Sequence, residues 1–173
     1  MKILLNKSVY FLLAGVLLTF ILAIPAQAQT ESEIIKIRAE VALINKGAPK
    51  FTKTTKTVED ISLEGTEATY YHLAKNLKKI TAEMFGETFN ATGEFYYRDG
   101  KLIFAYLKRN KYDTQIGLNT PPKVVSVEEQ RFYFADGELI RLLVGKKELK
   151  SASKKFSELK DEITSISDKL KNP

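Results

Sequence analysis

Few residues in this sequence combine the types and the spacing that chemistry requires. His72 is the only histidine, and the chain contains no cysteine. A zinc site would need carboxylates around that single imidazole, and neither a thiol nucleophile nor a disulfide is available. The sequence contains no Gly-x-Ser-x-Gly elbow and no phosphate-binding glycine loop. We therefore expect no enzyme activity, no metal and no cofactor, and we interpret His72 as a structural or solvent-facing residue.

Two aspartates in equivalent positions are the best candidates for a pair of catalytic carboxylates. Asp99 and Asp136 each precede a glycine. Because Asp-Gly is a strong signal for a two-residue hairpin turn, turn formation accounts for both aspartates without catalysis. Glu128 and Glu129 are adjacent on a predicted strand, so their side chains point to opposite faces and cannot act as a pair. The sequence thus indicates no catalytic residue.

A basic segment near the C-terminus is a candidate for contact with an anionic surface. It contains five lysines: Lys146, Lys147, Lys150, Lys154 and Lys155. They are candidates for binding anionic lipid head groups or cell-wall polymers, and the alternative is a solvated start of the last predicted helix. The formal net charge of the whole chain is only +6, which is not typical of a nucleic-acid-binding protein.

The first 28 residues have the three parts of a secretory signal peptide. Lys2 and Lys7 form a positive region, an apolar run extends over residues 9–24, and Pro25 precedes Ala26-Gln27-Ala28. We expect cleavage after Ala28, which leaves a single domain over residues 29–173 that is periplasmic or secreted. An uncleaved N-terminal anchor is the alternative. Membrane contact is expected only during export or weakly at the membrane surface.

The exported domain is predicted to begin with a helix over residues 31–46. Thr30 and Glu33 match a capping box, and Ile34, Ile37, Val41 and Ile44 form one apolar stripe. Gly47 and Pro49 end this helix. The polar, threonine-rich residues 50–56 are interpreted as a linker.

An internal repeat predicts an antiparallel sheet over residues 58–145. Residues 95–104 align with residues 132–141, with six of ten positions identical and an Asp-Gly turn in each copy. A weaker copy precedes them, in which Tyr70-Tyr71 leads to Leu77 through a turn at Asn76 that is one residue longer. Three successive hairpins make an antiparallel meander of about six strands.

Pairing across the turns assigns side chains to two sheet faces. One face is predicted to carry Phe95, Tyr97, Leu102, Phe104, Phe134 and Leu139, and to be covered by a helix. The opposite face is mixed and partly solvated. It supplies four candidate partner-binding residues of types that recur at binding hot spots: Tyr96, Arg98, Arg131 and Tyr133.

The last predicted helix covers residues 151–171 and follows a polar connection over residues 109–124. Its apolar residues recur in steps of three and four, and four of them are candidate partner-binding residues: Phe156, Leu159, Ile163 and Ile166. Such a stripe packs on the protein's own sheet, or it forms a coiled coil with a partner or with a second copy of the chain.

These patterns together predict an α+β domain with an N-terminal helix, an antiparallel meander and a C-terminal amphipathic helix. The helix containing Ile37-Arg38 and Ile44-Asn45, followed by repeated Tyr-Tyr-x-Asp-Gly-x-Leu-Ile hairpins, resembles a class of small exported bacterial proteins. That resemblance implies export and this architecture, and it implies no activity. The hairpins are also similar to MORN repeats, but Asp99 and Asp136 are 37 residues apart, whereas MORN units follow at shorter intervals. We expect a non-enzymatic binding or interaction protein, with envelope docking through the basic segment as one alternative and an enzyme as the other.

Overall fold

The computed structural model describes residues 26–117 and 121–173 and has a helix, an eight-stranded antiparallel sheet and a second helix. The helices and strands are, in order, α1 (Ala26–Gly47), a 3-10 turn η1 (Ala48–Lys50), β1 (Thr52–Val58), β2 (Thr66–Leu73), β3 (Asn76–Gly86), β4 (Phe89–Arg98), β5 (Lys101–Tyr112), β6 (Val124–Ala135), β7 (Glu138–Val144), β8 (Lys147–Glu148) and α2 (Lys154–Lys171). The predicted α+β class is confirmed. The predicted signal peptide lies outside the described residues, except that its last three residues begin α1. No described helix is long and apolar enough to span a bilayer.

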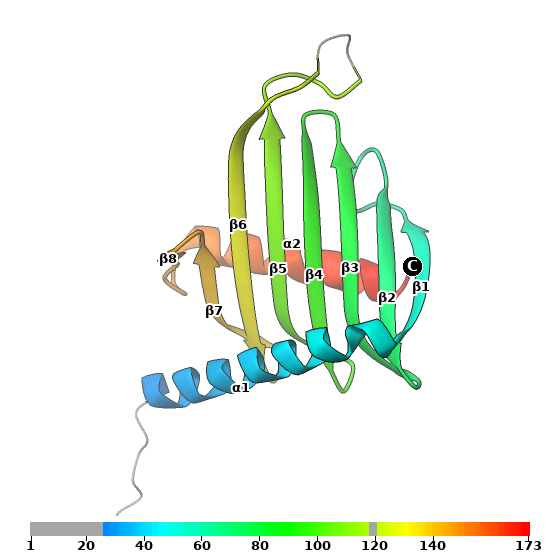
Figure 1. The fold of residues 1–173 in the computed structure, drawn as a ribbon. Coiled ribbons are helices and arrows are strands. Elements are labelled where there is room, and N and C mark those ends of the chain that lie inside the picture. Colours follow the sequence, from blue (N-terminus) through cyan, green and yellow to red (C-terminus); the bar gives the residue numbers. More distant parts are fainter. Residues whose placement is uncertain (1–25, 118–120) are drawn as a thin grey trace, which may run out of the picture.

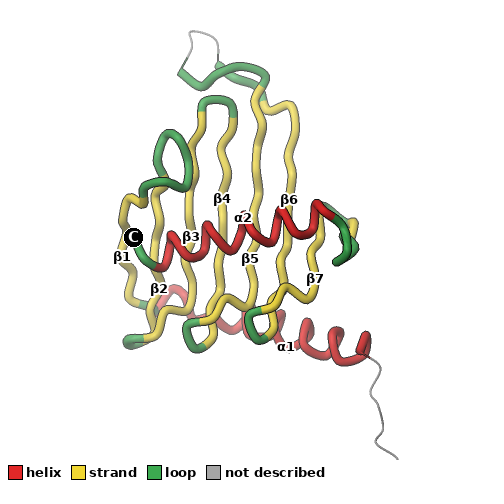
Figure 2. Tube along the Cα trace, turned by 180° about the vertical axis from the view of Figure 1, so that it is seen from behind, coloured by secondary structure: helices red, strands yellow, loops and turns green. Residues whose placement is uncertain are grey.

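The strands follow one another in a simple meander, and the two helices lie on opposite faces of the sheet (Figures 1 and 2). We call these the α1 face and the α2 face. Helix α1 crosses the end of the sheet that carries the β2–β3, β4–β5 and β6–β7 turns. Helix α2 crosses the middle of the other face. The two helices therefore leave different parts of the sheet uncovered.

The three hairpins share one pattern of strand pairing, which explains the internal repeat. In each hairpin a two-residue turn is followed by two pairs of opposed residues. The second strand then contains one extra, unpaired residue, a β-bulge, which is Lys78, Ile103 or Ile140 in the three hairpins. Asp99 and Asp136 have φ angles of 50° and 52°, and Gly100 and Gly137 also have positive φ, as a type I′ turn requires. The first hairpin has the same turn length, because Leu73 pairs with Asn76. The predicted longer turn at Asn76 is wrong, and Asn76 belongs to β3.

The extra residue also corrects the predicted position of Phe104. Tyr97 pairs with Leu102 as expected, but Tyr96 pairs with Phe104 and Phe95 with Ala105. A β-bulge shifts the alternation of a strand by one residue, so side chains beyond it change faces. Phe104 therefore lies on the α1 face, in contact with the rings of Tyr96 and Tyr133 at centroid distances of 5.7 and 4.9 Å.

The main hydrophobic core lies between the sheet and α2. Helix α2 starts after Ser153, whose hydroxyl accepts a hydrogen bond from the Phe156 amide. The helix buries Phe156, Leu159, Ile163 and Leu170, and Ile166 is partly buried beside them. Small residues of the sheet are buried in the same layer: Ala68, Ala82, Ala91 and Ala105 belong to this core, and Gly93 is also buried. The interpretation that this stripe packs on the protein's own sheet is the one the structure shows.

Several predicted boundaries differ from those in the structure. The expected linker at residues 50–56 is mostly strand β1, because its β-branched threonines favour extended backbone even without apolar residues. β5 continues to Tyr112, so the 109–124 connection is shorter than predicted. Thr30 lies within α1 and does not cap it, and α2 begins at Lys154 instead of Ser151.

Candidate functional site

Helix α1 is held on the sheet by a row of aromatic and charged side chains that the hairpin repeat places side by side. Each hairpin contributes one pair of opposed residues to the α1 face. The three pairs are Tyr71 with Lys79, Tyr96 with Phe104, and Tyr133 with Arg141. Ile34, Ile37 and Ile44 of α1 pack on the central part of this row. Tyr96 and Tyr133 are consequently only 1% and 4% exposed.

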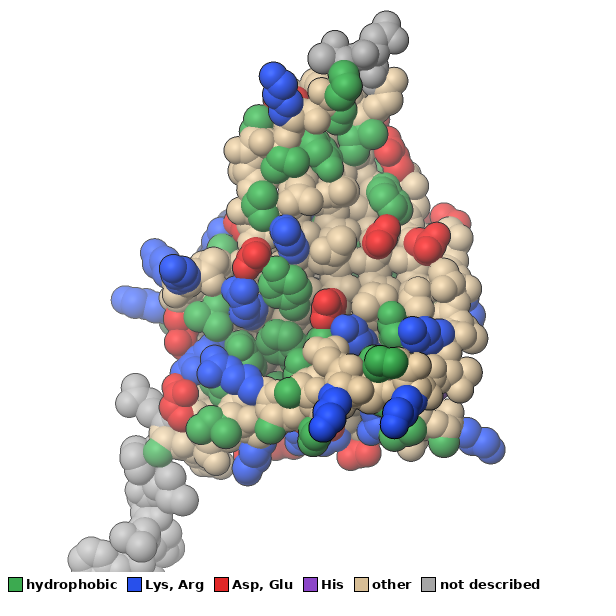
Figure 3. Space-filling model, in the orientation of Figure 1, with side chains coloured by type: hydrophobic (Ala, Val, Ile, Leu, Met, Phe, Trp, Pro, Cys, Tyr) green, Lys and Arg blue, Asp and Glu red, His purple; other side chains and the backbone are tan. Residues whose placement is uncertain are grey.

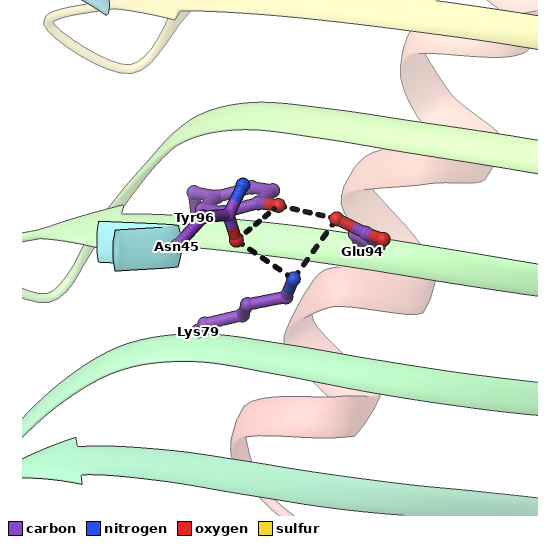
Figure 4. Close-up of polar contacts among 4 residues, drawn as sticks. All are labelled: Asn45, Lys79, Glu94 and Tyr96. Atoms are coloured by element: carbon purple, nitrogen blue, oxygen red, sulfur yellow. Dashed lines mark hydrogen bonds and ion pairs between the residues drawn. The ribbon is translucent and has the colours of Figure 1, made fainter. Parts of the chain in front are cut away.

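A buried polar network joins α1 to two strands of this row (Figure 4). The Lys79 ammonium, on a residue only 8% exposed, donates to Asn45 Oδ1 and to Glu94 Oε2, each at 3.0 Å. The Tyr96 hydroxyl donates its single proton to the same Glu94 oxygen, and its oxygen also lies 3.0 Å from Asn45 Oδ1. Lys79 Nζ also lies 4.9 Å from the centre of the Tyr96 ring. Every charged group in the network therefore has a partner.

The electrostatics of the network favour a structural role over a catalytic one. Burial alone would raise the pKa of Glu94, but hydrogen bonds from Tyr96 and Lys79 hold that pKa below its usual value. Burial, together with the hydrogen bond to Glu94, raises the pKa of the Tyr96 phenol far above its usual range. Glu94 thus stays ionised and Tyr96 stays neutral, so neither group is placed to exchange a proton near neutral pH.

Ion pairs extend the attachment of α1 along its length. Arg98 Nε lies 2.5 Å from Glu40, and Arg141 pairs with Glu31. The Arg38 guanidinium lies 5.5 Å from the centre of the Tyr133 ring. Of the four sheet residues predicted to bind a partner, Tyr96 and Tyr133 are buried beneath α1 and Arg98 is engaged by it. The expectation that these two tyrosines lie on a partly solvated face is wrong, because α1 covers them.

Beyond α1 the same sheet face is uncovered, and we call this part the distal face. Two rows of opposed side chains cross the central strands there. The first row is Thr81, Glu94, Tyr106 and Arg131, and the second is Glu83, Thr92, Lys108 and Glu129. On β1 and β2 the face continues as Thr55, Thr57, Glu67 and Thr69. Figure 3 shows hydrophobic, basic and acidic side chains interspersed over this part of the molecule.

Arg131 is the one predicted sheet-face residue that reaches the distal face. Its guanidinium lies 5.2 Å from the centre of the Tyr106 ring, pairs with Glu129 at 2.7 Å and donates to the Gly145 carbonyl oxygen. The hydrogen bonds from Arg131 and Tyr106 lower the pKa of Glu129. Within the described part of the chain, Glu83, Thr92 and Lys108 have no hydrogen bond or ion pair, so their polar groups are available to a partner.

The four helix residues predicted to bind a partner are instead part of the core. Phe156, Leu159 and Ile163 are 7%, 9% and 1% exposed, and Ile166 packs beside them. They face β-strands of their own chain, so a partner reaches them only if α2 leaves the sheet. The helix therefore offers no apolar docking stripe in this fold.

The five lysines of the basic segment are all exposed. Lys146 and Lys147 lie at the β7–β8 turn, and Lys154 and Lys155 begin α2. Only Lys154 has an ion pair among the described contacts, at 3.4 Å from Glu158. The segment is thus an accessible patch of positive charge.

The two turn aspartates lie at one end of the sheet, where they line a cavity of about 190 Å³ with Glu33 and Arg98. Neither Asp99 nor Asp136 has a hydrogen bond or ion pair in the described residues, and the turn geometry accounts for both. His72, near the end of β2, is half-buried. No cluster of metal-ligating side chains occurs within residues 26–117 and 121–173.

Sequence reasoning missed Lys79, Glu94 and Asn45, which anchor α1, and Tyr106 and Lys108 on the distal face. One signal was available, because Lys79 occupies the repeat position held by Phe104 and Arg141 in the other hairpins. Comparison with known proteins found no matching family model, curated protein or solved structure.

Proposed function

We propose that this chain is an exported, non-enzymatic interaction protein that binds a protein partner through its distal face. The observation that carries this proposal is the unequal covering of the sheet. The α2 face is largely apolar and buried, whereas the distal face presents Thr92, Lys108 and Glu83 with unpaired polar groups. Mixed polar and aromatic surface of this kind is typical of non-obligate interfaces.

Export is the first part of the proposal to test. The signal-peptide pattern of residues 1–28 supports it, and the ion pairs and apolar contacts described for α1 all lie after the expected cleavage site. Expression of the full sequence with cell fractionation and N-terminal sequencing should give an extracytoplasmic product that begins at Gln29. A product that begins at Met1 and stays with the membrane supports the anchor instead.

Binding through the distal face is tested by matched charge variants in an affinity capture from envelope extract. Thr92→Lys combined with Lys108→Glu changes one exposed and one half-buried position of the distal face. Thr164→Lys makes the threonine-to-lysine exchange on the exposed side of α2, outside the basic segment. We expect the first variant to lose the captured partner and the second to retain it. Retention by both variants contradicts the proposal.

The exposed basic segment supports a second candidate function, which is docking on an anionic polymer or lipid surface. Four of its five lysines have no described ion pair, which leaves their charge free for long-range attraction. Cosedimentation with anionic vesicles, compared with neutral ones, should then fall steeply as salt rises. Equal binding to both vesicle types, or binding that is insensitive to salt, rules this function out.

A further inference from the structure

The two edges of the sheet differ strongly. β8 has only two residues and leads directly into the turn before α2. β1 has seven residues, contains no proline or glycine, and pairs with β2 from Thr52 to Val58 without a register shift. All but Val58 are exposed. About half of the backbone amide and carbonyl groups of an edge strand point outward without a partner. β1 is therefore the long, regular and open edge of this fold.

Lysines often protect an edge strand, but those of β1 are turned back onto their own sheet. Lys53 Nζ lies 5.3 Å from the centre of the Tyr71 ring, and Lys56 Nζ lies 5.8 Å from the centre of the Tyr70 ring. Both rings belong to β2. The two charges therefore lie over the faces of the sheet and leave the backbone edge open to another strand.

The sequence of β1 is complementary to itself in one antiparallel register. When two copies pair about a two-fold axis at Thr55, all seven residues find a partner. Each lysine then faces a threonine, because Lys53 lies opposite Thr57 and Lys56 opposite Thr54. A register centred on Lys53 or on Lys56 places that lysine opposite the same lysine of the second copy, which is unfavourable. A register centred on Thr54 or on any other residue of β1 leaves more residues of the strand without a partner. A second copy therefore fits this edge without charge repulsion.

We propose that β1 is a self-association edge, at which two copies of this chain pair antiparallel about Thr55 and join their eight-stranded sheets into one. Because the two-fold axis is perpendicular to the sheet, each face continues into the same face of the second copy. The contact is seven residues long on each side and lacks a large apolar core, so the dimer is weak and depends on concentration.

Single cysteines test the proposal cleanly, because the native chain has none. The full-length sequence is expressed, the product is purified as the cell makes it, and a short bifunctional maleimide is added. Thr55→Cys places the two thiols opposite each other, about 5 Å apart at Cβ. Lys53→Cys places them roughly 13 Å apart along the strands, and Thr92→Cys lies in the interior of the sheet. We expect efficient dimer formation for Thr55→Cys only. Equal crosslinking of Thr55→Cys and Thr92→Cys, or stronger crosslinking at Lys53→Cys, overturns the proposal.

A charge variant separates loss of the dimer from loss of folding. Thr57 lies opposite Glu67 in its own sheet and opposite Lys53 of the second copy in the proposed dimer. In Thr57→Lys the new ammonium attracts Glu67 of its own chain, but it repels Lys53 of the second copy, and a two-fold dimer contains this repulsive contact twice. We therefore expect the dimer affinity, measured by sedimentation velocity, to fall roughly tenfold. Thr92→Lys lies between Glu83 and Lys108 in the interior of the sheet, away from β1, and should leave the affinity unchanged. A wild-type chain that stays monomeric at all concentrations overturns the proposal.

Discussion

The two faces of one sheet are covered in different ways, and the contrast separates the part that maintains the fold from the part available for binding. Helix α2 lies on apolar side chains, and the two polar contacts buried beneath it are neutral, from Tyr70 to the Leu170 carbonyl and between Tyr97 and Ser167. Its two ion pairs with the sheet, Arg109 with Glu162 and Lys160 with Glu138, lie at the partly exposed margins of the helix. Helix α1 is attached by a charged network and two ion pairs around a narrower apolar stripe. We infer that α2 completes the core, whereas α1 rests on a face that is only partly buried.

The strongest test of this contrast is truncation beneath α2. Ile163→Ala should lower the free energy of unfolding by about 2–5 kcal/mol, because it leaves a cavity in a fully buried apolar layer. Ile35→Ala, at an exposed position of α1, should change it by less than about 0.5 kcal/mol. Urea denaturation measures both. If Ile163→Ala lowers the free energy of unfolding only slightly, the main core does not lie beneath α2.

The next effect is expected in the polar network of α1. Glu94→Ala leaves the buried Lys79 ammonium without its carboxylate, so we expect a loss of about 1–3 kcal/mol. Lys79→Met added to Glu94→Ala should recover part of that loss, because the buried charge is then removed as well. If the double variant is as unstable as the sum of both single variants, the two side chains are not coupled.

A smaller effect is expected at the ion pair between Arg98 and Glu40, since partly exposed pairs contribute little. Arg98→Ala should cost no more than about 1 kcal/mol, measured by thermal or urea unfolding. A loss as large as that of Ile163→Ala would mean that α1 is as important to the core as α2.

Acid should loosen α1 before α2. The pKa values of Glu94 and Glu31, which hold α1, and of Glu138, which pairs with Lys160 of α2, are lowered in the folded protein, so these groups stabilise it above their unfolded pKa near 4.5. Two of these three carboxylates hold α1, and Glu94 is the one that is partly buried. That contribution is lost as the pH falls through the lower folded values. Hydrogen exchange at pH 7 and at pH 4 or below should show earlier loss of protection in α1. If both helices lose protection from exchange at the same pH, α1 is not the more weakly attached of the two helices.

The smallest effect on stability is expected on the distal face. Thr92→Lys combined with Lys108→Glu should change the free energy of unfolding by less than about 0.5 kcal/mol, because neither native side chain has a described hydrogen bond or ion pair and the two new charges lie opposite each other. Urea denaturation checks this result alongside the binding assay. A large loss of stability would make these residues structural.

The fold class could be predicted from the sequence because the patterns that specify its elements lie within short stretches of the chain. The heptad stripe from Phe156 to Leu170 and the two Asp-Gly turns each specify an element from neighbouring residues. The bulge that moves Phe104 to the α1 face is set by strand pairing, and nothing in the alternating pattern reveals it. β1 was missed because its threonines and lysines lack an apolar face.

The candidate site was harder to predict because burial depends on how distant elements cross. Tyr96 and Tyr133 were expected on a partly solvated face, but the path of α1 over the hairpin turns buries them. Lys79 is an ordinary lysine in sequence and is recognised as a buried charge only when Asn45 and Glu94 are placed beside it. Arg131 was identified correctly as a residue of the mixed face, since strand alternation alone determines its direction.

Site-specific photo-crosslinking in living cells tests the central claim most directly. A photoreactive amino acid is placed at Thr92 on the distal face in one strain and at Ser157 on the exposed side of α2 in another. We expect a discrete crosslinked partner at Thr92 and none at Ser157. Adducts at Ser157 alone, or none at either position, would contradict binding through the distal face.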